Sequence, residues 1–446
     1  MAVNYPQGHV FYRNLYRTFP VITHGKGVYL YDSDGGRYLD ASGGAAVVNI
    51  GHGIAEISGS LSSQAYKVGY VNGTQFSHQP VEDLAERIAE FLPFSDGKIF
   101  FLTSGSEAIE ASIKLARQYW VEQGQKEKFY VLSRNPSYHG NTLAALSLSA
   151  REHYKYIYQP MLMKSSMIPA PYCYRCFCQE IFPSCNSKCA HELEKRILKL
   201  GKENVSAFIT EVIGGSSTGV TVPPPEYFST IRKICDEYEI LLIVDEVMTG
   251  IGRTGKWLAS HHFNLKPDIV VLGKGLTSGY FPLSAVATTK EIVDVLYDNG
   301  RNFLHSQTFA HHPVGCAAGL ATLDYIRDHD LLKKSRENGS VLLSELSALL
   351  SHPHVGDVRG RGLLAAVEFV SDKKDKTPFP RELKYVEKFF QRALKNGIVI
   401  WPNVGHADGV NGDLVLVAPP FTISMQEISR IRRLLEDTLA EMDTIL

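Results

Sequence analysis

The feature that most constrains this chain is a series of short apolar runs that alternate with helical patterns from about residue 98 onward. The runs have the length of strands, whereas the stretches between them carry apolar residues at helical spacing. Alternation of this kind is typical of a mostly parallel sheet with helices on both faces. The runs cover residues 98–102, 129–132, 207–212, 240–247, 268–272 and 283–288.

The pattern changes towards both chain ends. Residues 27–39 predict short strands joined by a turn at Asp34-Gly35-Gly36, and residues 331–350 and 382–395 predict amphipathic helices. The sequence therefore predicts an α/β protein with a large domain at residues 61–325. A smaller α+β domain is expected to combine both chain ends, residues 1–60 and 326–446.

The charge balance and the length of the apolar runs exclude several classes of protein. The chain has 46 Lys+Arg against 47 Asp+Glu, a formal net charge of −1, so it cannot bind nucleic acid or an anionic membrane through bulk charge. None of its apolar runs approaches the roughly 20 residues that a spanning helix needs. The first residues show no secretory signal. We therefore expect a cytoplasmic protein with small-molecule substrates and neither nucleic-acid nor membrane partners.

Two charged residues stand where predicted strands end. Lys274 lies between two glycines directly after the run at 268–272, in a tight turn where a partly desolvated amine becomes a nucleophile. Asp245 follows five apolar residues and needs a cation or a donor if it is buried. Because about one β-α-β unit separates them, both can project from the same edge of the sheet. A solvated turn lysine and a helix N-cap are the alternative interpretations.

Two further groups are predicted at this edge. Gly105 and Ser106 open a helical stretch after the first run, and the free N–H groups of a helix N-terminus can bind phosphate. The spacing fits neither a Walker loop nor a dinucleotide motif, and an ordinary serine N-cap is the alternative. Tyr138 and His139 follow the second run. Together the amine, the acid, the phosphate cradle and the aromatic ring fit pyridoxal 5′-phosphate.

These residues and their order resemble the class-III pyridoxal-phosphate aminotransferases, the ω-transaminase group of fold type I. The resemblance spans nearly the whole chain and is specific, because many motifs agree in order and spacing. Besides the motifs above, it rests on Tyr38-Leu39-Asp40, the block from Asp245 to Gly255, Leu272-Gly273-Lys274-Gly275, Thr308-Phe309 and Gly360-Arg361-Gly362. It implies a fold-type-I transferase with pyridoxal 5′-phosphate as cofactor.

The resemblance also implies a role for each matching residue. The expected catalytic residues are Lys274, which forms the Schiff base and moves protons, Asp245, which holds the pyridine nitrogen protonated, and Glu211, on the substrate side of the ring. A structural carboxylate is the alternative for Glu211. The expected cofactor-binding residues are Gly105, Ser106, Tyr138, His139, Asp245, Val247, Lys274 and Thr308. Because Thr308 would reach the phosphate in the neighbouring subunit, a homodimer with a shared site is expected.

The chain departs from the family in two pocket positions. Many ω-transaminases have a C-terminal arginine that binds the carboxylate of the keto acid, but residues 398–404 and 412–420 contain no arginine. Another residue must then bind this carboxylate, or the acceptor is not a simple dicarboxylate. Ala46 stands where amine-selective members often have tryptophan, which predicts a roomier pocket.

A cysteine-rich segment is the third departure. Cys173, Cys176, Cys185 and Cys189 form two close pairs, which allows a tetrahedral zinc site with His191 in reserve. The spacing between the pairs is shorter than in common zinc modules. Reduced thiols or a redox-sensitive loop are favoured over zinc, and no metal is expected.

The sequence therefore predicts an aminotransferase that moves an amino group from an ω-amino acid or an amine to a keto acid, with pyruvate as the favoured acceptor. An aminomutase or amino-acid epimerase on the same scaffold is the nearest alternative, distinguished by its independence from a separate keto acid. A binding protein without catalysis is a remote alternative, because nothing in stability requires a desolvated lysine beside a strand-end acid.

Overall fold

The largest sheet of the computed structural model, which describes residues 2–3, 5 and 8–444, has seven strands in the order β6-β12-β11-β10-β9-β7-β8. β12 runs antiparallel to both of its neighbours, and the other neighbouring pairs are parallel. All six predicted runs form strands of this sheet, so the α/β prediction is confirmed. The strands are β6 (Lys98–Leu102), β7 (Tyr130–Asn135), β8 (Ser166–Pro169), β9 (Val205–Glu211), β10 (Leu241–Asp245), β11 (Ile269–Leu272) and β12 (Ser284–Thr288).

The edge strand β8 was not predicted, because its four residues begin with serine and end with proline. β7 is longer than its apolar run, since it continues through Ser133 and Arg134 to Asn135. Arg134 is fully buried although arginine is rarely found inside a protein. The last residues of β7 are therefore held in place by polar contacts, such as the hydrogen bond from Arg134 Nη2 to the Glu211 carbonyl.

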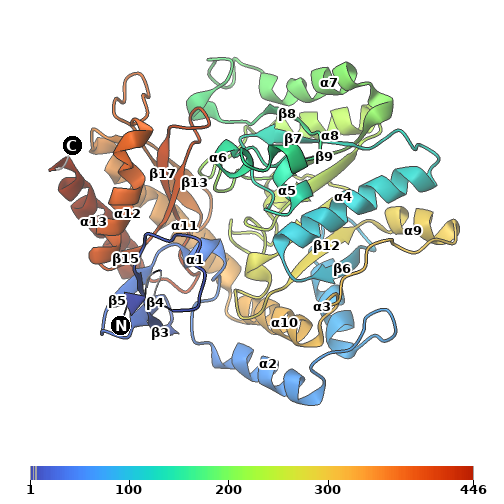
Figure 1. Cartoon of the computed structure of the whole chain (residues 1–446), viewed down its shortest axis with the longest axis horizontal. Coiled ribbons are helices and arrows are strands. Elements are labelled where there is room, and N and C mark those ends of the chain that lie inside the picture. The colour runs from blue at the N-terminus through green and yellow to red at the C-terminus, as the bar shows by residue number, and fades with distance from the viewer. Residues whose placement is uncertain (1, 4, 6–7, 445–446) are drawn as a thin grey trace.

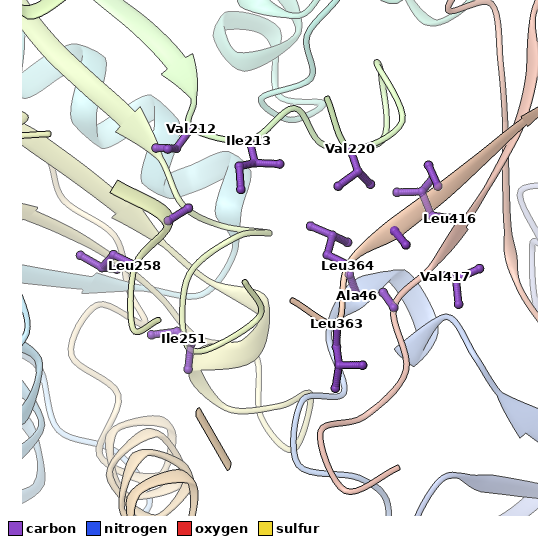
Figure 2. Packing of buried hydrophobic residues seen from close by; sticks show 14 of the residues in the cluster. Ala46, Val212, Ile213, Val220, Ile251, Leu258, Leu363, Leu364, Leu416 and Val417 are labelled. Atoms are coloured by element: carbon purple, nitrogen blue, oxygen red, sulfur yellow. The ribbon is translucent and has the colours of Figure 1, made fainter. Parts of the chain in front are cut away.

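Successive residues of the central strands belong to two different hydrophobic clusters. Leu241 and Ile243 pack in one cluster with α4 and α9, and Leu242 and Val244 pack in the other. Side chains alternate between the faces of a strand, so a strand that is apolar at every position is covered on both sides. Figure 1 shows the helices on either side of this sheet, and Figure 2 shows part of the larger cluster.

The described part of the chain contains ten longer helices. They are α2 (Ala55–Lys67), α3 (Gln79–Ala89), α4 (Gly105–Glu122), α7 (Lys188–Leu200), α8 (Tyr227–Glu237), α9 (Lys290–Asp298), α10 (Pro313–Asp328), α11 (Leu331–Ser347), α12 (Tyr385–Lys395) and α13 (Met425–Asp443). Short helices are α1 (Gly43–Ala46), α5 (Leu143–Leu148) and α6 (Glu152–Lys155). α11 and α12 lie in the two stretches predicted as amphipathic helices.

Two four-stranded sheets are built from the chain ends. One has the order β15-β5-β4-β3, and its strand β15 (Ile398–Val399) pairs in parallel with β5 (Arg37–Asp40), which joins segments far apart in sequence. The other has the order β13-β14-β17-β16. Figure 1 shows the blue and red ends together at one side of the molecule. The exact domain boundaries stay a prediction.

The remaining strands of these sheets are β3 (Ile22–Lys26), β4 (Tyr29–Asp32), β13 (Val355–Gly360), β14 (Ala365–Phe369), β16 (Trp401–Val404) and β17 (Asp413–Val417). β1 (Ala2–Val3) and β2 (Phe19–Pro20) form a separate two-stranded sheet. In the described part of the chain, none of the helices combines the length and the hydropathy required to span a bilayer.

Candidate active site

The two predicted acids lie side by side because of strand register. β9 ends at Glu211 and β10 ends at Asp245, and the parallel pairing places these two residues directly opposite each other. β11, the next strand, ends at Leu272 and leads through Gly273 to Lys274. The carboxyl ends of the three adjacent strands thus bring Glu211, Asp245 and Lys274 to one edge of the sheet, as the sequence predicts.

Lys274 begins a short 3-10 turn with a positive φ of 42°, a conformation that residues other than glycine seldom adopt. Removal from water lowers the pKa of its amine, and the negative charges of Asp245 and Glu211 oppose this effect. A lowered pKa increases the fraction of neutral amine near neutral pH. The lysine is therefore suited to act as a nucleophile and to accept a proton at Nζ.

Asp245 is held by a buried hydrogen-bond network. Its Oδ2 lies 2.8 Å from Nδ1 of His139, and its Oδ1 accepts a bond from the Val247 N–H at 3.0 Å. The side chains of Asp245 and His139 are 7% and 0% exposed, so water does not screen their interaction. The N–H of His139 donates to Ser149 Oγ at 2.8 Å, which fixes the backbone of the histidine. The carboxylate is therefore fixed in orientation.

Glu211 is buried, and burial raises the pKa of its carboxyl group while His139 and Arg134 lower it. Its Oε1 accepts a bond from the Gly215 N–H at 2.9 Å. Its Oε2 has no hydrogen-bond partner among the described residues and lies 3.9 Å from Arg134 Nη2. Arg134 Nη2 instead donates to the Glu211 carbonyl at 2.6 Å. The Oε2 atom of Glu211 is therefore a buried oxygen that faces the Arg134 guanidinium.

The phosphate cradle predicted at residues 105–106 is the N-terminus of α4. Ser104 and Glu107 close a capping box in which each side chain accepts a bond from the other's N–H. The N–H groups of Gly105 and Ser106 take no part in this box, so they stay available to an anion. A Cβ on Gly105 would lie 3.0 Å from Val247 Cγ1, so the glycine keeps this approach open.

The described site residues enclose a cavity of about 220 Å³. Its walls include every predicted cofactor-binding residue except Thr308, and also Glu211. The further lining residues are Ser104, Gly140, Ile213, Ser216, Met248 and Thr249. These residues fit pyridoxal 5′-phosphate, because one cavity offers an amine, a buried acid, two ring-packing side chains and free helix N–H groups.

Two predicted positions lie away from this cavity. Thr308 is exposed, and its carbonyl accepts a bond from the Tyr70 hydroxyl at 2.9 Å. Ala46 is 1% exposed and belongs to the core cluster, where Figure 2 shows it with Leu363 and Val417. The prediction that Ala46 widens the pocket is therefore not supported within this chain.

The cysteine segment contains free thiols. All seven cysteines are unpaired, and the sulfurs of Cys176 and Cys178 lie 3.4 Å apart. Among the described residues, no three His, Cys, Asp or Glu side chains are arranged to hold a metal ion. The zinc alternative for Cys173, Cys176, Cys185 and Cys189 is therefore not supported.

Sequence reasoning missed three polar residues near the site, namely Arg134, Ser216 and Arg151. Arg134 lies inside the strand β7. The available signal was an arginine within one predicted strand and a glutamate at the end of a later one, since opposite charges of this kind can pair. Ser216 lies in the Gly/Ser-rich loop after β9, a typical position for ligand contacts in α/β proteins. Arg151 lies between two short helices, and no motif marks it.

Residues 11–439 match the family model described as Aminotransferase class-III. An uncharacterized aminotransferase of Bacillus subtilis, YodT, is 38% identical over 95% of this chain and 96% of its own length. The putrescine–pyruvate aminotransferase of Pseudomonas aeruginosa is 35% identical over 94% of this chain and 91% of its own length.

A solved structure shows the same fold. The (S)-enantioselective ω-transaminase of Thermomicrobium roseum superposes with a TM-score of 0.91 at 36% identity. The match covers 98% of this chain and 96% of the solved chain. The sequence match and the structural match thus agree over almost the entire length.

Proposed function

The chain belongs to the class-III aminotransferases, which are pyridoxal-phosphate enzymes, and on this basis we propose that it moves an amino group from an ω-amino acid or simple amine to a keto acid, with pyruvate as the favoured acceptor. The observation that carries the proposal is the convergence of Lys274, Asp245 and Glu211 at one sheet edge, beside a helix N-terminus. The similarity to an enzyme named for putrescine and pyruvate supports the donor and acceptor classes.

Bound pyridoxal phosphate withdraws electrons from the carbon that carries the substrate nitrogen, so that a proton on this carbon can be removed. We assign the phosphate to the N–H groups of Gly105 and Ser106. The ring nitrogen is assigned to Asp245, and the two ring faces to Tyr138 and Val247. This assignment uses groups that are either fixed by hydrogen bonds or packed at the cavity wall.

Lys274 is proposed to carry the proton transfers at Nζ. Its lowered pKa supplies a neutral amine that can take a proton from substrate and return it at a neighbouring atom. The Val247 N–H and the His139 ring contact the two carboxyl oxygens of Asp245 and stabilise its negative charge. A fixed negative charge there keeps a proton on the ring nitrogen. Glu211, which lines the same cavity as Lys274 and Asp245, is proposed to face the substrate.

We expect the working unit to be a homodimer. Thr308 is exposed and lies outside the cavity of its own chain. This position is compatible with a contact between Thr308 and the cofactor phosphate of a second subunit. Its surroundings expose apolar surface, since Leu304 is 79% and Phe309 is 52% exposed. Apolar surface of this kind is favoured at subunit contacts. If the phosphate is bound from both subunits, an isolated monomer holds its cofactor weakly.

The visible absorption spectrum of the holoenzyme tests the proposal. We expect one amine donor, added without keto acid, to remove the band of the bound cofactor, and pyruvate to restore it. Lys274→Ala is the control: it lacks the amine that moves the proton, so the donor and pyruvate should not drive the cycle of band loss and band recovery. A band that persists while the substrate is isomerised or racemised without any keto acid would show an aminomutase or epimerase instead.

A further inference from the structure

A second cavity of about 470 Å³ adjoins the cofactor cavity and shares Tyr138 and Ser216 with it. Two of its described lining residues are arginines, Arg13 and Arg151, and none is an aspartate or glutamate. His153 also lines it, but burial and the nearby arginines lower the pKa of this histidine to about 4, so it is neutral at pH 7. The cavity is therefore cationic through its arginines.

Arg151 is buried in the wall of this cavity, with 7% of its surface exposed. Nη1 donates to Ser216 Oγ at 3.2 Å, and Nη2 donates to Asn403 Oδ1 at 2.8 Å. The guanidinium lies 4.8 Å from the ring centre of Tyr154 and 5.9 Å from that of Tyr138. All of these partners are uncharged, and no described carboxylate forms an ion pair with Arg151. Such a buried cation is unfavourable unless an anion joins it.

The two other buried arginines and the partly buried Arg359 have different partners. Arg359 pairs with Asp357 and Glu368 at 2.7 and 2.8 Å. Arg134 lies 3.9 Å from the Glu211 carboxylate and donates to the Glu211 carbonyl. Arg253 has no acidic partner either, but its Nη1 and Nη2 are occupied by three backbone carbonyls and one amide oxygen. Arg253 also lines neither of the two cavities. Arg151 is thus distinguished by two neutral bonds and an open side towards a cavity that adjoins the cofactor site.

One partner of Arg151 comes from the stretch in which the family arginine is missing. Asn403 lies in β16 (Trp401–Val404), within the arginine-free residues 398–404. Its amide oxygen accepts from Arg151, while its Nδ2 has no partner among the described residues. The C-terminal segment therefore still reaches the substrate side of the site, but it positions a cation from another segment instead of supplying one.

We infer that Arg151 binds the carboxylate of the 2-oxo acid acceptor and so sets the acceptor class of the enzyme. The inference rests on the proposed aminotransferase function and deepens it. A planar guanidinium and a carboxylate form two parallel charged hydrogen bonds, which give both affinity and orientation. Tyr138, shared by the two cavities, places this contact beside the expected cofactor ring.

The test compares two acceptors, 2-oxobutyrate and propanal, which differ only in that 2-oxobutyrate has a carboxylate. The holoenzyme first receives its amino group from an amine without a carboxylate, and then reacts with one of the two acceptors. For Arg151→Gln we expect the apparent KM for 2-oxobutyrate to rise about 10- to 100-fold, the range that loss of a charged hydrogen-bonded contact gives. The rate constant with propanal should stay within about twofold of wild type, because propanal makes no such contact. Arg151→Lys should show a smaller rise in KM for 2-oxobutyrate than Arg151→Gln, because lysine keeps the positive charge but cannot donate two parallel hydrogen bonds.

Arg196→Gln is the matched control, because Arg196 also donates to a serine, Ser166, but lies on α7 away from both cavities. It should react like wild type with both acceptors. A second measurement is calorimetric titration of holoenzyme with propionate, which binds but cannot react. Wild type and Arg196→Gln should bind it with equal affinity, and Arg151→Gln at least about 10-fold more weakly.

Each other result overturns a different statement. Equal losses with both acceptors in Arg151→Gln would make Arg151 a structural residue. Unchanged 2-oxobutyrate kinetics and unchanged propionate binding would assign the carboxylate to another group. Both outcomes leave the aminotransferase proposal standing, because the wild-type enzyme still transfers its amino group to both acceptors. That proposal fails only if no acceptor restores the cofactor band of the wild-type enzyme.

Discussion

The cofactor cavity and the arginine-lined cavity adjoin each other, but they are built in different ways. The first takes its chemical groups from the ends of adjacent parallel strands, whose register fixes Glu211 opposite Asp245. The second takes Arg151 from the connection between α5 and α6 and Asn403 from β16, 252 positions further along the chain. The difference teaches that the ends of parallel strands in one sheet carry the cofactor chemistry, whereas we infer that the acceptor is selected by a loop arginine together with a strand of a different sheet.

The comparison predicts that a change at a strand end affects every substrate. Asp245→Asn removes the fixed charge and leaves His139 without its anionic partner. We expect kcat to fall about 10²- to 10³-fold, as is typical when an active site loses one preorganised electrostatic group. Steady-state kinetics with 2-oxobutyrate and with propanal should show the same loss. A loss confined to one acceptor would break the comparison.

A change in the second cavity should instead affect only acceptors with a carboxylate. Asn403→Asp keeps the shape of the side chain but supplies Arg151 with an internal carboxylate. We expect the apparent KM for 2-oxobutyrate to rise about 10-fold or more, because the new ion pair competes with the substrate. Kinetics with propanal serve as the control and should change little. A lower KM for 2-oxobutyrate would contradict the role of Arg151.

The phosphate cradle provides a test of backbone packing beside the strand-end site. Gly140 has a φ of 138°, and a Cβ there would lie 2.5 Å from Ser106 Oγ and 2.9 Å from Ala145 Cβ. We expect Gly140→Ala to weaken cofactor binding about 5- to 100-fold, because strain of about 1–3 kcal/mol must be relieved by moving Ser106. Titration of the cofactor-free protein with pyridoxal phosphate, followed by fluorescence, measures this. Gly124→Ala is the control, because Gly124 also has a positive φ but has open space around it.

The smallest effect is expected on stability and depends on pH. Burial raises the pKa of Glu211 in the folded state, so the folded protein binds its proton more tightly than the unfolded chain does. The contribution of Glu211 to stability is therefore present below its ordinary pKa and is lost as the pH rises through the raised value. Glutamine cannot ionise, so Glu211→Gln should not lose unfolding free energy as the pH rises. We expect the loss in wild type to be on the order of 1 kcal/mol.

Thermal melts at pH 5 and pH 8 check this prediction. The Tm of Glu211→Gln minus that of wild type should be more positive at pH 8 than at pH 5. Glu203→Gln is a surface control and should give the same difference at both values, because Glu203 is exposed. An equal difference at both pH values for Glu211→Gln would show that the glutamate is not destabilised by burial.

Most of the regular structure could be predicted from the sequence. Every apolar run became a strand of the large sheet, because strands covered on both faces must be apolar throughout. The same pattern located Asp245 and Lys274, since a charged residue directly after such a run has to lie at the sheet edge. The edge strand β8 escaped prediction because four residues with a serine and a proline carry too little signal.

The second cavity could not be predicted in this way. Arg151 has no motif around it, and its meeting with Asn403 depends on how β16 packs against the loop before α6. Ala46 was placed near the pocket by resemblance to the family, whereas in this chain its side chain is buried in the core, so its effect on the pocket stays a prediction. Both cases depend on long-range packing that local sequence does not encode.

By itself, the sequence pattern determined the α/β class, the strand-end positions of Lys274 and Asp245, and the helix N-terminus that can bind a phosphate. These follow from periodicity and burial, which act between neighbouring residues and need no knowledge of distant segments. Only the tertiary structure decided that Arg151 stands unpaired beside the cofactor cavity, held by an asparagine from the C-terminal part. The physical reason is that the cost of a buried charge depends on every group around it, and those groups come from segments far apart in the chain.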